Sequence, residues 1–180
     1  MRTIKNIMLT ALTMFVVQFM SPNSLYAQEN PSLSDAEVAH IAVVANQIDI
    51  YYAAIAKDKS KNKDVLQFAE TMANDHTAVM AQAKELVTKL GVTPKDNAVS
   101  QKLLSDAEKT RISLKSLPAA KFDKAYIDNE VGYHKAVIAA VRDLLIPETE
   151  NQELKELLEG VLSALDIHLE HALMVQKKLS

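Results

Sequence analysis

Five ionisable residues lie at or beside positions where the helical pattern of this sequence otherwise places apolar side chains. They are Asp49, His76, Glu130, His134 and His168. Burying an unpartnered polar side chain costs about 1–3 kcal/mol, and burying a bare charge costs far more, so such residues must be paired or ligated. Carboxylates and imidazoles that converge inside a protein suit iron, manganese or zinc. The pattern therefore predicts one metal ion held by these five residues.

Two other interpretations of the same residues stay open at this point. The acids and histidines could form a hydrogen-bonded network without metal, in an envelope interaction or scaffold protein. They could also belong to a metalloenzyme, which would need a solvent path and an open coordination position. The sequence contains no Gly-rich phosphate loop and no evident pairing of a nucleophile with a base. A non-enzymatic protein is therefore favoured.

The first two elements that must position these residues are long helices. A capping box of Ser34 with Glu37 begins the first helix, which should end near Ser60. The polar stretch 57–64 predicts a tight turn, and the second helix should end at Leu90, before a glycine. Apolar residues spaced alternately by three and four give each helix one buried stripe.

The second half of the chain predicts one short and two long helices. The short helix is expected over 99–115 and a long helix over 119–146, before a proline. Thr149 with Gln152 predicts a capping box for a last helix that should end near Lys178. Four long amphipathic helices indicate an all-α four-helix bundle. The long crossover between the second and third long helices, which contains the short helix, is typical of ferritin-like bundles.

Helical rise places the five residues at similar heights in such a bundle. Counted from the turns, Asp49 lies level with His76, and Glu130 lies level with His168. His134 lies one turn from Glu130 on the same helix. The crossover allows both pairs to meet at one height.

The first 27 residues predict a signal peptide. Arg2 and Lys5 precede the largely apolar run 7–20, and cleavage could follow Ala27. Residues 28–33 should then form a disordered lead-in, and residues 34–180 a single bundle domain. No later segment is expected to span a membrane. The sequence contains no cysteine, so the chain has no disulfide and no cysteine to carry a lipid. We expect a soluble protein in the periplasm or otherwise outside the cytoplasm.

The charge balance argues against a nucleic-acid partner. Loss of residues 1–27 removes two basic residues and no acids, which leaves 18 basic and 23 acidic residues and a net charge of −5. A mildly acidic domain with scattered lysines lacks the basic patch that nucleic-acid binding needs. The sequence does not identify a protein partner, and the protein could form a homo-oligomer.

Four short segments resemble the DUF4142 family of exported bacterial proteins of unknown function. They are Asn46–Asp49, Met72–His76, Phe122–Tyr126 with its continuation to His134, and His168–Ala172. The likeness covers about residues 34–179. It implies a ferritin-like fold, whereas the family itself supplies no activity.

The ferritin-like superfamily suggests a di-iron template, from which this chain departs. That template takes one glutamate from each of two helices and a Glu-x-x-His motif from each of the other two. The residues three before His76 and His168 are Ala73 and Leu165, so both bridging carboxylates are missing. The resemblance therefore implies one mononuclear site for sequestration or stress protection. His134 would be either a ligand or a residue that supports one.

Overall fold

The computed structural model describes residues 32–180, and every regular element within them is helical. The predicted signal peptide and residues 28–31 of the lead-in lie outside the described residues. Leu33, which was assigned to the lead-in, is buried, and its N–H donates to Glu148 Oε2 at 3.0 Å. The elements are α1 (Asp35–Lys59), α2 (Lys63–Leu90), α3 (Ala98–Ser116), α4 (Ala119–Ala140), the π-helical turn η1 (Val141–Leu145), α5 (Ile146–Glu148) and α6 (Gln152–Lys178).

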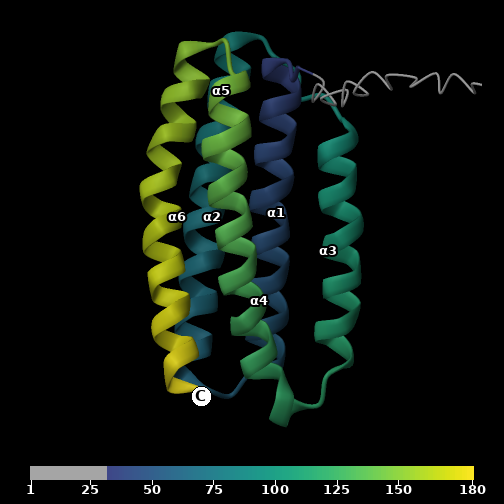
Figure 1. Ribbon diagram of the computed structural model, residues 1–180, viewed down its shortest axis with the longest axis vertical. Coiled ribbons are helices and arrows are strands. Elements are labelled where there is room, and N and C mark those ends of the chain that lie inside the picture. The colour runs from purple at the N-terminus through teal and green to yellow at the C-terminus, as the bar shows by residue number, and fades with distance from the viewer. Residues whose placement is uncertain (1–31) are drawn as a thin grey trace, which may run out of the picture. The chain divides into compact units, whose positions relative to one another are not determined.

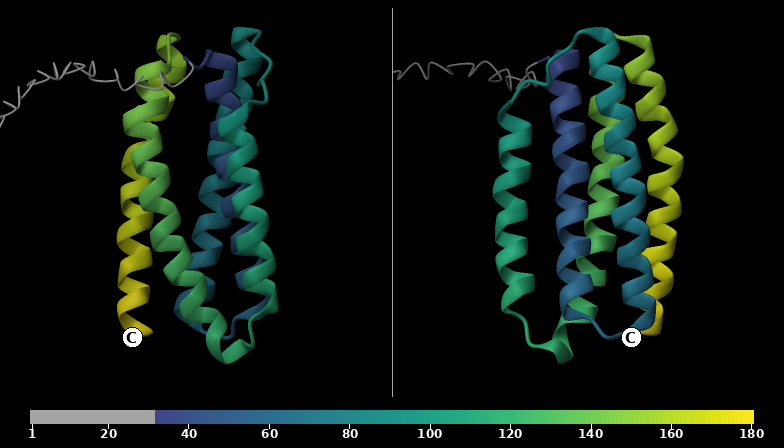
Figure 2. Two further views of the ribbon diagram at one scale, coloured as in Figure 1. Left: turned by 45° about the vertical axis from the view of Figure 1, so that its right-hand side comes forward. Right: turned by 180° about the vertical axis from the view of Figure 1, so that it is seen from behind.

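Four of the helices surround a common core. Helix α1 packs against α2, α2 against α6, α6 against α4, and α4 against α1. Helix α3 packs mainly on α1, outside this ring, as Figures 1 and 2 show. Because α3 carries the chain back along the ring, α2 and α4 run in the same direction (Figure 1). The helix predicted over 99–115 is present as α3, which has 19 residues and is the shortest of the five long helices in the described part.

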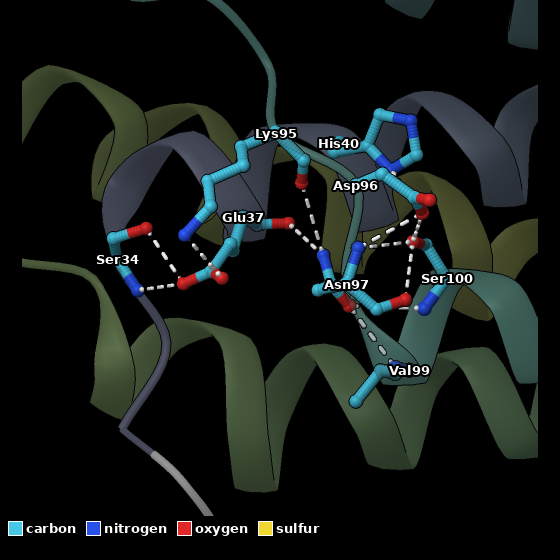
Figure 3. Close-up of polar contacts among 8 residues, drawn as sticks. All are labelled: Ser34, Glu37, His40, Lys95, Asp96, Asn97, Val99 and Ser100. Carbon is cyan, nitrogen blue, oxygen red and sulfur yellow. Dashed lines mark hydrogen bonds and ion pairs between the residues drawn. The ribbon is translucent and has the colours of Figure 1, made fainter.

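Polar contacts fasten the start of the crossover helix to α1 (Figure 3). Asn97 caps α3 by accepting from the N–H groups of Val99 and Ser100, and its Nδ2 donates to the Glu37 carbonyl at 3.2 Å. Lys95 forms an ion pair with the Glu37 carboxylate at 3.1 Å. The long connection is therefore held at its beginning by side chains that also cap two helices.

The helix ends are partly as predicted. The Ser34–Glu37 capping box is present, and Gly91 ends α2 with a φ of 64°, which a glycine adopts without strain. The predicted Thr149–Gln152 box is wrong, because Asn151 caps α6 and the Thr149 hydroxyl donates to the Leu145 carbonyl at 2.6 Å.

The third predicted long helix does not stop before Pro147. Its α-helical part ends at Ala140, and the π-helical turn η1 carries the chain into α5, which contains Pro147. The N–H of Ile146 donates to the Val141 carbonyl, five residues back. This wider turn was not predicted, because a π-turn leaves no clear periodic signal in a sequence.

Helix α1 is long and apolar enough to cross a membrane, judged by length and composition alone. The mean hydropathy of its most apolar window is 1.3, and 56% of that window is buried within the protein. The sequence-based expectation that no segment after residue 27 could span a membrane overlooked this helix. Because α1 packs against three other helices and buries Asp49 among them, burial in the core accounts for its apolar composition.

Candidate metal centre

The five predicted residues converge in a polar layer that divides the apolar core. The cluster on one side is rich in aromatic residues and includes Tyr52, Phe68 and Phe122. The cluster on the other side is aliphatic and includes Ile138 and Leu158. All five polar residues are buried, with relative exposures of 0–5%. Each of the four surrounding helices contributes at least one of them, namely Asp49, His76, Glu130, His134 and His168.

Two groups of potential ligand atoms lie within this layer, and His134 belongs to both. One group is His76, His134 and His168, and the other is Asp49, Glu130 and His134. Within each group, one nitrogen or oxygen from every residue lies within 4.8 Å of the others. The three imidazole rings pack around one point, with centroid separations of 5.2–5.9 Å. Either group could hold a cation.

Asp49 places one oxygen between two of the histidines. Its Oδ2 lies 3.2 Å from His76 Nε2 and 3.6 Å from His134 Nε2. Neither nitrogen, and neither oxygen of Asp49, has a hydrogen-bond partner among the described residues. Ligands bound tetrahedrally at 2.0–2.1 Å lie about 3.3–3.4 Å from one another. The two separations therefore resemble those around a shared ion more than those of a hydrogen-bonded network.

One ring nitrogen of each histidine is hydrogen bonded to an acceptor oxygen. His76 Nδ1 donates to Asn46 Oδ1 at 2.7 Å, and His134 Nδ1 donates to the Glu130 carbonyl at 3.0 Å. His168 Nε2 donates to Asp75 Oδ2 at 2.9 Å.

These outer hydrogen bonds determine the tautomer of each neutral imidazole. The proton lies on the outer nitrogen, so the opposite nitrogen keeps its lone pair. Those opposite atoms are His76 Nε2, His134 Nε2 and His168 Nδ1, and all three are buried without a hydrogen-bond partner. Oriented imidazoles with a supporting acceptor are the usual arrangement around protein-bound metals.

Burial dominates the electrostatics of the layer. It lowers the pKa of His76 to about 3 and that of His134 to about 4, so both rings are neutral near pH 7. Burial also raises the pKa of Asp49 to about 7. The pKa of Glu130 is raised well above its ordinary value, first by burial and then by the neighbouring Asp49 charge. The two neutral imidazoles of His76 and His134, beside acids that ionise reluctantly, carry no positive charge, which a cation would supply.

Glu130 lies beside Asp49 and His134. Its Oε2 lies 3.7 Å from His134 Nδ1, the nitrogen whose proton the Glu130 carbonyl already accepts. Glu130 groups with Asp49 and His134, whereas His168 groups with His76 and His134. The predicted level pairing of Asp49 with His76 is present. Glu130 and His168 belong to different groups of potential ligands, joined through His134.

Sequence reasoning assigned no role to two residues that orient the histidines. Asn46 lies one turn before Asp49 on α1, and its Nδ2 donates to the Ala42 carbonyl at 2.8 Å, which leaves Oδ1 for His76. Asp75 directly precedes His76, but its carboxylate accepts a hydrogen bond from His168 on the neighbouring helix α6. Asn46 carried a usable signal, because an amide one helical turn from a buried acid lies on the same face. Asp75 carried none, since its contact depends on how α6 packs.

The aromatic residues next to the layer are packing residues with few polar contacts. Tyr133 donates its hydroxyl hydrogen to the Ala45 carbonyl at 2.8 Å. The hydroxyl of Tyr126 is buried without a hydrogen-bond partner among the described residues. Burial raises the pKa of both phenols well above the ordinary value, so neither supplies an anionic ligand near pH 7.

Comparison with known proteins gives a family and no described activity. A family model described as "Domain of unknown function (DUF4142)" matches residues 21–175. No curated protein and no solved structure matches the chain. The geometry of the site is thus the main guide to function.

Proposed function

The chain belongs to the DUF4142 family, and from that premise we propose that it is a non-enzymatic protein that binds one divalent metal ion. His76, His134, His168 and Asp49 are the proposed ligands. Glu130 lies next to Asp49 and is proposed to stay protonated, because its pKa is raised well above the ordinary value. Three imidazoles and one carboxylate suit zinc, iron or manganese.

One observation carries this proposal: three buried imidazoles each place a ring nitrogen within 4.8 Å of the others, and each ring has one hydrogen-bonded nitrogen and one without a partner. A structural network without metal would instead satisfy the inner atoms, since an unsatisfied buried polar group costs about 1–3 kcal/mol. A cation at this point would satisfy the three nitrogens and Asp49 together. The metal-free scaffold interpretation would need protonated Glu130 and Asp49 to donate to Asp49 and His76, and it leaves the inner nitrogen of His168 without a partner.

We propose that the fold is a ferritin-like bundle and that the protein acts outside the cytoplasm. The ring of four helices with α3 as crossover supports the fold assignment. The charged and apolar pattern of residues 1–27 supports export. Sequestration of a metal ion, or protection against metal stress, fits a closed site in a soluble carrier.

Elemental analysis of natively purified protein tests the proposed function. The mature protein, prepared without a chelator or a histidine tag, is compared with the His76→Ala/His168→Ala double variant. His40→Ala serves as the matched control, because His40 lies on α1 beside Asp96 and outside both ligand groups. We expect about one metal ion per wild-type and control chain, and almost none in the double variant.

Circular dichroism of each variant keeps this comparison interpretable. If the double variant keeps its helical signal and loses the metal, the site is supported and the ion is identified. The proposal would be overturned if wild-type protein held no metal even after incubation with zinc, iron and manganese. It would also be overturned if the double variant bound as much metal as the wild type.

A further inference from the structure

A partly open cavity adjoins the polar layer. It has a volume of about 140 Å³ and lies among α1, α2, α4 and α6. Asp49, His76 and His134 line it, together with apolar residues as distant as Val87 and Leu154. From His76 to Val87 along α2 is eleven residues, or about 16 Å of helix. The cavity is therefore an elongated, mainly apolar space with the proposed metal ligands among its walls.

Small side chains keep this space open. Alanines from three helices line it, at Ala42, Ala45, Ala83 and Ala140. Protein interiors are normally packed without voids of this size, and voids reduce stability. An apolar cavity of about 150 Å³ stays dry in water and takes up benzene or xenon. The cavity in this protein is thus large enough for an apolar body of the same size.

The polar atoms in the cavity wall provide an independent indication of a ligand. Asp49 and His134 are fully buried and His76 is 5% exposed, yet both Asp49 oxygens and the Nε2 atoms of both histidines have no hydrogen-bond partner. A molecule in the cavity could therefore reach an ion held by these residues. Its apolar part would lie among the alanines and leucines.

We propose that the cavity binds a small amphiphile with a short alkyl or single-ring body and one oxygen or nitrogen donor at its end. The donor atom would bind the metal ion as a fifth ligand beside the four proposed ones, and the body would fill the apolar space. This inference rests on the proposed function, because the donor atom needs the ion. It adds a ligand class that metal binding alone does not imply.

Two probes separate the apolar space from the coordinated head group. Xenon, detected by its nuclear magnetic resonance shift, reports the space in protein with or without metal. Pentanoate and acetate, titrated into cobalt-loaded protein, share a carboxylate and differ in chain length. We expect xenon to bind, and pentanoate to change the cobalt absorption spectrum at a concentration roughly tenfold or more below that of acetate.

Ala83→Leu should fill the space without touching the ligands. Ala83 lines the cavity two helical turns from His76, whereas Ala81 on the same helix is exposed, so Ala81→Leu is the matched control. Ala83→Leu should keep its cobalt and its helical signal, lose xenon binding and lose the preference for pentanoate. Ala81→Leu should behave as the wild type.

The results distinguish failure of this inference from failure of the proposed function. Wild-type protein that binds cobalt but not xenon, or that binds pentanoate no more tightly than acetate, overturns the cavity proposal and leaves the metal site intact. The same holds if Ala83→Leu keeps the pentanoate preference. Wild-type protein that binds no cobalt overturns both proposals together.

Discussion

At the scale of single residues, the centre combines groups that are costly without a cation. Asp49 is fully buried, lies near two neutral imidazoles, and makes no hydrogen bond within the described residues. The sequence was sufficient to select all five residues of the layer, because each lies in or beside an apolar stripe. It could not show which nitrogen of each histidine faces inward, since that depends on Asn46, Asp75 and a backbone carbonyl.

Asp49→Asn should have opposite effects on stability without and with metal. Burial raises the pKa of Asp49 from 3.8 to about 7, so the folded metal-free protein retains a proton that the unfolded chain has already released. The contribution of this carboxyl to the free energy of unfolding therefore falls as pH rises from about 4 through 7. Between pH 5 and pH 8, the free energy of unfolding of metal-free Asp49→Asn should therefore rise by about 2–3 kcal/mol relative to that of the wild type.

Urea unfolding at both pH values, with and without zinc, measures this effect. With zinc bound, the wild type should be more stable than Asp49→Asn, because the amide is a poorer ligand than the carboxylate. Asp143→Asn, at an exposed position on η1, is the control and should show neither change. If the difference in free energy of unfolding between Asp49→Asn and the wild type stays constant with pH, the raised pKa of Asp49 is contradicted.

Asp75→Ala should weaken metal binding while leaving the fold nearly unchanged. The Asp75 side chain is 50% exposed, so its removal costs little packing, but His168 loses the acceptor that fixes its ring. Loss of such a supporting contact typically lowers metal affinity about 10–100-fold. Competition with a chelator measures the affinity, and Asn74→Ala, at the exposed neighbouring position, is the control. Equal affinities of Asp75→Ala and Asn74→Ala would show that His168 needs no orienting partner.

At the scale of elements, periodicity and capping residues predicted the helices well and the connections between them less well. The α-helical starts at Ser34 and Ala119 and the end at Gly91 follow from local chemistry that a sequence displays. The π-helical turn η1 and the cap of α6 depend on competition between neighbouring groups. Thr149 resembles a cap, but its hydroxyl donates to Leu145, and Asn151 accepts from the N–H of Leu154.

Asn151→Ala should destabilise the protein by about 1 kcal/mol, because it removes the side chain that caps α6. Gln152→Ala should have almost no effect, since Gln152 is exposed and bonds only to Glu156 on the same helix. Thermal unfolding of both variants decides between the two capping schemes. A larger loss for Gln152→Ala would restore the Thr149–Gln152 box.

At the scale of the whole molecule, the four helices of the ring meet at the polar layer. The sequence predicted an all-helical protein with a long crossover and a level pairing of Asp49 with His76, because both follow from helix lengths and short turns. It did not predict that α3 would pack on α1, nor which residues would orient His76 and His168. Those features depend on how helices distant in sequence rotate and pack.

Metal binding should stabilise the whole protein, because the ligands come from all four helices of the ring. Free metal at about 100 times its dissociation constant adds about 2.7 kcal/mol to the free energy of unfolding. For about 150 packed residues this raises the melting temperature by roughly 5–10 °C. Calorimetry with zinc and then with excess chelator measures the shift. The His76→Ala/His168→Ala variant should show none, and an equal shift in that variant would place the binding elsewhere.

X-ray absorption spectroscopy of the zinc-loaded protein tests the central claim most directly, because it counts imidazole ligands around the bound ion. The account predicts three imidazoles and one carboxylate oxygen, with zinc–ligand distances of about 2.0–2.1 Å. His168→Ala should lower the imidazole count by one, whereas His40→Ala should leave it unchanged. Zinc surrounded by oxygen atoms alone, or by a single imidazole, would contradict a centre built from His76, His134 and His168.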